Sequence, residues 1–254
     1  MDFTTLEWWQ LLALLVAGLV AGTINTLAGG GSLITLPLML WIGLPAPVAN
    51  ASNRISLIFQ NISGTTNFHR SGRLHWPTVA LLASCALPPA LLGAWLAIDV
   101  SETLFRRILV AILLVSIVIV ARGRRGGGEL TQPRQRVKLA LWFVVVGFYA
   151  GFIQAGLGFA LLALLHGVGQ LDLVRSNAIK VTVVLICQVG ALAVFTVAGS
   201  VNWTAGLALA LGSASGAAIA VRMQVRKGTA WVRRIVLGLL TTCTVILVIQ
   251  EIFA

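Results

Sequence analysis

The sequence predicts an all-α polytopic membrane protein made of two inverted repeats, each with about five hydrophobic helices, one of them short and broken. Three observations lead to this fold class. Of the 254 residues, 58% are hydrophobic and only 10% are charged, whereas soluble proteins carry roughly 25% charged residues. Apolar runs of about 20 residues, the length that spans a bilayer, recur along the whole chain. The second half also repeats the first at a nearly constant shift.

The first repeat, residues 1–121, contains five hydrophobic segments. We predict them over about 7–28, 32–44, 48–68, 76–98 and 104–121. The first begins with Trp8 and Trp9, which suit a membrane interface. The second has about 13 residues, which is short for a complete crossing. A basic, glycine-rich linker follows over 122–136, and the second repeat, residues 137–254, again has five segments.

The first repeat is interrupted by Gly29-Gly30-Gly31-Ser32. Three glycines in a row cannot hold a stable helix. Lipid cannot bond the freed N–H and C=O groups, so a break inside a membrane must be buried in protein or line a wet cavity. Gly156-Leu157-Gly158 interrupts the second repeat at the matching position, and the short run 159–168 follows it. The alternative is that Gly29 to Gly31 form a simple turn at the membrane surface.

The repeats are predicted to be inverted. A shift of 127 residues pairs Trp76 with Trp203, and a shift two residues longer pairs Asn25 with Gln154. The loop before Trp76 is basic, but the matching loop before Trp203 is uncharged, so the two loops belong on opposite sides. With ten crossings, both termini lie outside a bacterial-type cytoplasmic (inner) membrane. Of the 18 Lys and Arg, 14 then lie on the cytoplasmic side.

Matching broken helices in inverted repeats are typical of secondary transporters, whose sites lie where the repeats meet. A helix N-terminus offers free N–H donors and a partial positive charge, which favour an anion. The candidate substrate-binding residues are Asn25, Gly29, Gly30, Gly31, Ser32, Asn50, Asn53, Arg54, Gln154, Gly156, Gly158, Asn177 and Lys180. The amides among them have an alternative role in helix capping and in bonds between helices.

Arg54 and Lys180 are cations inside predicted membrane helices, where a charge is costly and usually functional. The alternative is that both snorkel to the interface. Other polar and small residues are assigned to helix contacts. Gln60, Asn61 and Gln188 are expected to bond between helices, and Gly22, Gly93, Gly151 and Gly216 to allow close packing.

Composition also argues against several function classes. All seven acidic residues lie at segment ends or in loops, so a sodium or proton site built on a membrane carboxylate is not expected. The three cysteines have no metal-ligand spacing, and no catalytic set is present, so we expect no enzyme, no cofactor and no metal. The net charge of +11 is explained by cytoplasmic loops and anionic lipids, not by nucleic acid. The expected partners are a small anion and membrane lipids; homo-oligomerisation stays open.

The run from Ala21 to Leu33, Ala-Gly-Thr-Ile-Asn-Thr-Leu-Ala-Gly-Gly-Gly-Ser-Leu, together with Pro37 and Ala-Asn-Ala-Ser-Asn at 49–53, resembles the sulfite exporter TauE/SafE family of membrane permeases. The run from Gly151 to Gly158 fits it too, and the resemblance covers about 11–249. It implies transport of sulfur-containing anions such as sulfite, sulfonates or sulfolactate-type acids. We therefore predict a permease that moves a small anion by alternating access. The alternative is a non-transporting membrane subunit or assembly factor with a cytoplasmic partner.

Overall fold

The structure, a computed structural model, describes residues 6–27, 29–99, 133–152, 154 and 156–252. Its elements are α1 (Trp8–Leu27), α2 (Ser32–Trp41), α3 (Ala46–Arg70), α4 (Trp76–Leu96), η1 (Ala97–Asp99), α6 (Pro133–Phe152), α7 (Leu157–Ala163), η2 (Leu164–Val168), α8 (Leu173–Val197) and α9 (Trp203–Ile252). This part of the chain contains no strand, which confirms the all-α class. The predicted segment 104–121 lies outside the described residues, as does most of the linker.

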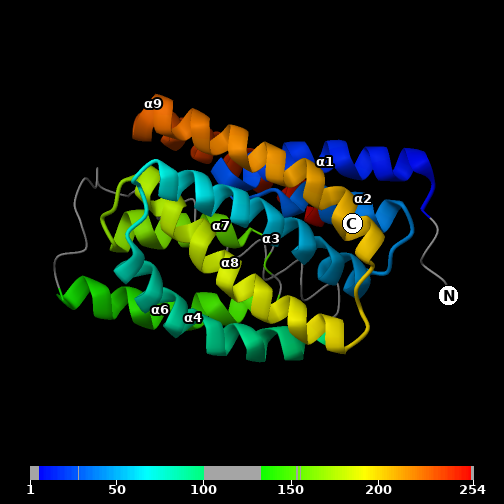
Figure 1. The fold of residues 1–254 in the computed structure, drawn as a ribbon, viewed down its shortest axis with the longest axis horizontal. Coiled ribbons are helices and arrows are strands. Elements are labelled where there is room, and N and C mark those ends of the chain that lie inside the picture. Colours follow the sequence, from blue (N-terminus) through cyan, green and yellow to red (C-terminus); the bar gives the residue numbers. More distant parts are fainter. Residues whose placement is uncertain (1–5, 28, 100–132, 153, 155, 253–254) are drawn as a thin grey trace.

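Four described helices are long and apolar enough to cross a membrane, namely α1, α4, α8 and the part of α9 up to Gly228. The chain is therefore a multi-pass membrane protein. α3 is as long as α8, with 25 residues each, but much more polar. Its polar side chains are turned inward, since Ser52, Asn53, Arg54, Ser56, Gln60 and Asn61 are all buried. α3 lies between α9 and α8 and packs on both of them (Figure 1).

α1 and α2 form a hairpin around the first glycine break. α2 has 10 residues, or about 15 Å of helix, roughly half of the ~30 Å hydrocarbon core. Trp41 at its end packs edge-on against Trp9 at the start of α1, with ring centroids 6.1 Å apart. α2 is therefore too short to complete a crossing, which corrects the predicted count of ten crossings, and it returns to the end of the molecule where α1 began.

α6, α7 and η2 form the corresponding hairpin in the second half. Gly156, with φ 71°, caps the N-terminus of α7, and α7 continues into the π-helical turn η2. Gly169, just after η2, packs against Leu139 near the start of α6. The sequence predicted the short segment but not its π-helical geometry. α6 also begins earlier than expected, at Pro133 inside the predicted linker, because proline suits the first turn of a helix.

Element bounds repeat along the chain as the sequence shift predicts. α3 begins at Ala46 and α8 at Leu173, which are 127 residues apart, and the same shift separates the first residues of α4 and α9. Gly228 breaks α9 with φ 73° and ψ −174°. Beyond it the chain returns toward the end of the molecule where α1 begins (Figure 1).

The described helices pack into two bundles, and each bundle contains one long helix from the other half of the sequence. The first bundle contains α1, α2, α3 and α9, and the second contains α4, α6, α7, η2 and α8. Glycines bring the paired backbones together: Gly22 and Gly216 at the contact of α1 with α9, and Gly93 and Gly151 at the contact of α4 with α6. Each is too close to the opposite backbone to accept a Cβ, so the predicted packing role of these four glycines is confirmed.

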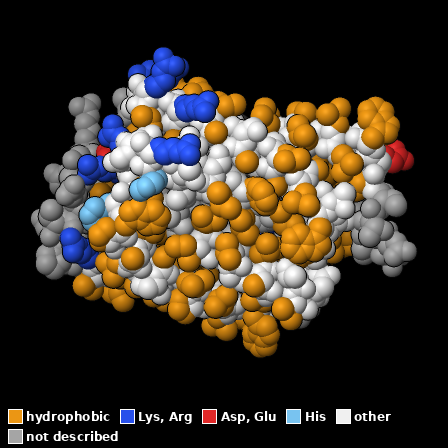
Figure 2. Space-filling model, in the orientation of Figure 1, with side chains coloured by type: hydrophobic (Ala, Val, Ile, Leu, Met, Phe, Trp, Pro, Cys, Tyr) orange, Lys and Arg blue, Asp and Glu red, His pale blue; other side chains and the backbone are white. Residues whose placement is uncertain are grey.

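Hydrophobic and basic side chains occupy different parts of the outer surface along the long axis. Hydrophobic side chains cover most of the visible face, and Lys and Arg side chains gather at one end, opposite the end that carries the N-terminus (Figure 2). The helix termini at the basic end include the end of α3, with Arg70, and the start of α8, with Arg175.

Candidate functional site: a buried polar cavity between the two breaks

The two breaks meet inside the molecule. Gly29, with φ +109°, lies directly against the backbone of Gly158 and Phe159. Gly31 lies against Ala21 and the side chain of Asn25, and Gly30 is buried as well. A side chain on Gly29 would force the two breaks apart. The alternative of a simple surface turn is therefore excluded, because the first break is enclosed by the second.

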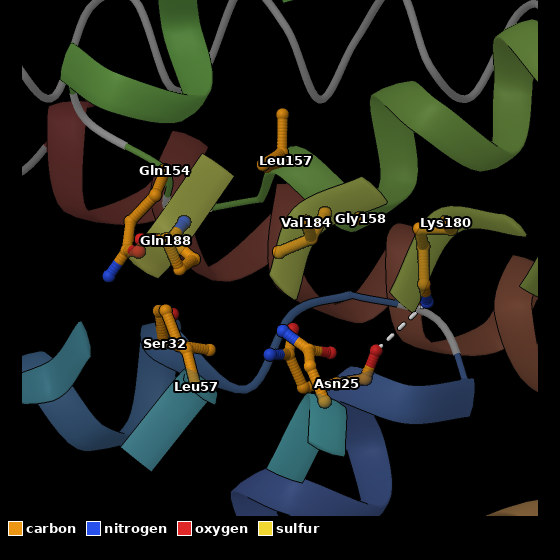
Figure 3. A pocket seen from close by; sticks show the side chains of 10 residues that line it. Asn25, Ser32, Leu57, Gln154, Leu157, Gly158, Lys180, Val184 and Gln188 are labelled. Carbon is orange, nitrogen blue, oxygen red and sulfur yellow. Dashed lines mark hydrogen bonds between the residues drawn. The ribbon is translucent and has the colours of Figure 1, made fainter. Parts of the chain in front are cut away.

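A small cavity of about 20 Å³ lies beside this contact (Figure 3). Its walls are formed by Asn25, Ser32, Leu57, Asn61, Gln154, Leu157, Gly158, Lys180, Val184 and Gln188. Ser32 begins α2 and Gly158 belongs to the first turn of α7, so both short helices start at the cavity. A water needs about 10–15 Å³ by this measure. The two bundles are thus closed around the cavity in this conformation.

Lys180 lies at one end of the cavity and is only 3% exposed. Its Nζ donates hydrogen bonds to the carbonyl oxygens of Asn25 at 3.0 Å and Thr26 at 3.2 Å. These carbonyls end α1, where the helix dipole is negative and no intrahelical N–H is available. The alternative in which Lys180 snorkels to the interface is excluded by this burial.

Arg54 makes the corresponding contact on the other broken helix. Its Nη1 donates to the carbonyl of Ala150 at 3.2 Å and to Gln188 Oε1 at 2.7 Å, and its Nη2 donates to the carbonyl of Gly151 at 2.5 Å. The guanidinium also lies 4.6 Å from the centroid of the Phe195 ring. Arg54 is fully buried, so snorkelling is excluded here too.

Each of the two cations therefore binds the end of an interrupted helix from the other half of the sequence. Arg54 on α3 binds the last turn of α6, and Lys180 on α8 binds the last turn of α1. Among the described residues, neither one pairs with a carboxylate. Backbone carbonyls at two interrupted helices replace the acidic partners that buried cations usually need.

Three amides at the cavity have side-chain atoms that lack hydrogen-bond partners among the described residues. The buried atoms without a hydrogen bond include both side-chain polar atoms of Gln154, Nδ2 of Asn61 and Nε2 of Gln188. Arg54 can only donate, so Gln188 must present Oε1 to it, and its NH₂ group is left as a free donor. Gln154 and Gln188 lie toward one end of the cavity and Lys180 toward the other (Figure 3).

The remaining predicted residues lie around this cavity at different distances. Asn53 supports the wall, since it donates to Ser32 Oγ at 3.3 Å and accepts from Thr35 Oγ1 at 2.9 Å. Asn177 donates to the carbonyl of Leu27 at 3.0 Å and so helps to cap α1. Asn50, near the start of α3, is half-buried and is not part of the cavity wall.

The sequence assigned Asn61 and Gln188 to helix contacts and did not place them at the site. The repeat shift of 127 residues was the signal that could have found them, because it pairs Asn61 with Gln188 and Leu57 with Val184. All four line the cavity. Residues that match across the two repeats and lie at the same depth of α3 and α8 are expected to meet where those helices cross.

A membrane-embedded helical protein whose two interrupted helices meet at a buried polar cavity has the architecture of a membrane transporter. The chain belongs to the sulfite exporter TauE/SafE family, whose model matches residues 14–247. Membership of a transporter family accords with the expectation of a non-enzymatic permease.

Curated relatives carry similar descriptions. A probable membrane transporter protein, ORF9, of Sinorhizobium sp is 32% identical over 87% of this chain and 85% of its own length. A probable membrane transporter protein of Haemophilus influenzae is 26% identical over 89% of this chain and 90% of its own length. The probable membrane transporter protein YfcA of Escherichia coli K12 is 27% identical over 87% of this chain and 82% of its own length. No solved structure matches this chain.

Proposed function

We propose that this protein is a permease for a small anion, a sulfur-containing oxyanion or an organosulfonate, which it carries by alternating access. The anion occupies the cavity between the breaks after the bundles separate enough to widen it. Substrate binding by the residues that we singled out from the sequence stays a prediction, and the inverted arrangement of the repeats is part of this proposal.

One observation carries the proposal: the cavity offers hydrogen-bond donors and a cation but no acid. Lys180 and the amides of Gln154, Asn61 and Gln188 line it, and no Asp or Glu is among its described lining residues. A cation or a proton that requires a carboxylate finds none among the described lining residues, whereas an oxyanion can accept from several of these groups. The family's description as sulfite exporters supports the choice of a sulfur oxyanion.

The charge distribution supports an orientation. The basic end of the molecule (Figure 2) belongs on the cytoplasmic side by the positive-inside rule. We therefore propose that both termini lie outside, which the start of α1 at the opposite end and the return of the chain after Gly228 support. We propose the bacterial-type cytoplasmic membrane as the location.

Proteoliposomes test the proposal. Purified protein is reconstituted and uptake of radiolabelled sulfite is measured beside unlabelled sulfonates and organic acids as competitors. We expect saturable uptake that sulfonates inhibit. Empty liposomes and protein with Lys180→Gln serve as controls. A reconstituted, folded protein that moves none of these anions would instead favour the non-transporting membrane subunit.

A further inference from the structure

We propose that the cavity between the breaks is built for a single negative charge, so that the ligand is a monovalent anion with a sulfonate-type head and not a divalent anion. This inference rests on the proposed anion transport. It specifies the charge of the ligand and assigns Lys180 as the residue that binds this charge.

Lys180 is the only Lys or Arg among the described residues that line the cavity. Its ammonium has three N–H donors, and two of them are used on the carbonyls of Asn25 and Thr26. The third remains for a ligand. The cavity therefore receives one positive charge, from a group that is already held in place by the end of α1.

Arg54 does not supply a second charge. All its described hydrogen bonds go to Ala150, Gly151 and Gln188, and Phe195 lies 4.6 Å from the guanidinium. It is not part of the cavity wall. Arg54 reaches the cavity only through Gln188, whose amide it orients. Arg54 is thus a positioning residue, and its guanidinium is held by the carbonyls at the end of α6.

The other unpartnered donors in the cavity wall are neutral, whereas Arg54 Nε, which also lacks a partner, lies outside that wall. Gln154 is 4% exposed, Asn61 2% and Gln188 0%, and each has an unpartnered buried nitrogen at the cavity. Such amides can satisfy ligand oxygens, as buried polar groups require. They do not balance a second full charge, whose transfer into a site of low dielectric is costly unless it is paired. One cation plus neutral donors therefore suits a monoanion with several oxygens.

Three ligands of similar shape and different charge test this inference. Sulfate is divalent, methanesulfonate is monovalent and dimethyl sulfone is neutral. Each is titrated at constant ionic strength against the purified full-length protein, and the shift in its thermal unfolding is followed, because a ligand that binds the native state raises apparent stability. We expect methanesulfonate to act at a concentration about tenfold or more below that of sulfate and of the sulfone, the size of effect that a charge-assisted hydrogen bond gives.

Substitutions locate the effect. Lys180→Gln should abolish the preference for methanesulfonate over the sulfone. Lys138→Gln, which removes an exposed cation on α6, should leave it unchanged. If Lys180→Gln does not yield folded protein, the order of the three ligands on the wild-type protein still decides the question.

The outcomes separate this inference from the function it rests on. Sulfate that binds as well as methanesulfonate overturns the single-charge site and leaves anion transport standing. The same holds if sulfite is transported but methanesulfonate does not bind. A sulfone that binds as well as methanesulfonate also overturns the single-charge site alone. A protein that neither binds nor moves any anion overturns both.

Discussion

A buried arginine and a buried lysine without acidic partners need another source of compensation. Arg54 and Lys180 find it in the last carbonyls of α6 and α1, which are free because each helix is interrupted there. Each cation makes at least two such hydrogen bonds, and hydrogen bonds to charged groups contribute about 1.5–3 kcal/mol each. The interruption and the cation therefore stabilise one another. Without the break there would be no free carbonyls, and without Lys180 the carbonyl of Thr26 would keep only the weaker contact from Gln224, at 3.3 Å.

Gln188→Glu tests the donor role of this amide. The new carboxylate keeps an acceptor for Arg54, so the fold should persist, but it presents an oxygen to the cavity where Gln188 presents NH₂. We expect the half-saturating anion concentration to rise about tenfold or more, because an acceptor replaces a donor and adds negative charge. Thermal-shift titration with methanesulfonate measures this. Gln170→Glu makes the same change at an exposed loop position and should have no effect. Equal affinities in the two variants would show that Gln188 does not face the anion.

For individual residues, the sequence predicted which side chains lie near the site better than it predicted what each of them does there. Arg54 and Lys180 looked equivalent, yet Lys180 aligns with Asn53 under the repeat shift. Arg54 is one residue further on, which is about 100° around a helix. That rotation takes its guanidinium away from the cavity wall and onto α6. Which amides remain unpartnered, such as that of Gln154, depends on contacts between distant helices and has no signal in a single sequence.

Among the elements, the interrupted helices were predicted best because glycine runs are strong local signals. The start of α2 at Ser32 and the break at Gly156 agree with the sequence. The hairpin geometry was not predicted, because it depends on the distant contact of Trp9 with Trp41. The π-helical turn η2 has no composition signature of its own.

Gly29→Ala and Gly43→Ala form a matched pair of substitutions. Both residues have a positive φ, of +109° and +93°, but Gly29 lies against the Gly158 backbone, whereas nothing lies within 4 Å of a Cβ at Gly43. The backbone strain alone should cost about 1–2 kcal/mol in either variant. Gly29→Ala must also separate the two breaks, so we expect a lower thermal unfolding midpoint than for Gly43→Ala and the loss of transport. Similar midpoints and similar uptake would contradict the close contact of the breaks.

In the whole molecule, the packing units differ from the sequence halves. The division into two repeats near residue 121 stays a prediction. The packing units are a separate matter, since α9 packs on α1 and α3 while α4 packs on α6 and α8. Composition carries no information on this exchange, because each helix presents small residues that fit any close partner. The hydrogen bonds of Arg54 and Lys180 both join one bundle to the other. If the bundles move as units, these are bonds that must rearrange when the cavity opens.

Two pairs of cysteines test which units move. Thr65 and Thr182 join the bundles, with hydroxyl oxygens 3.1 Å apart, and Ser56 and Ser213 join α3 to α9 within the first bundle, at 2.9 Å. Both pairs are close enough for cysteines to cross-link with little backbone movement. In a background without the native cysteines, oxidation of Thr65→Cys/Thr182→Cys should stop uptake, and a reductant should restore it, because alternating access requires the bundles to separate. Oxidation of Ser56→Cys/Ser213→Cys should leave uptake intact. The reverse pattern would show that α9 moves with the second bundle, and uptake that survives both cross-links would exclude movement between these bundles.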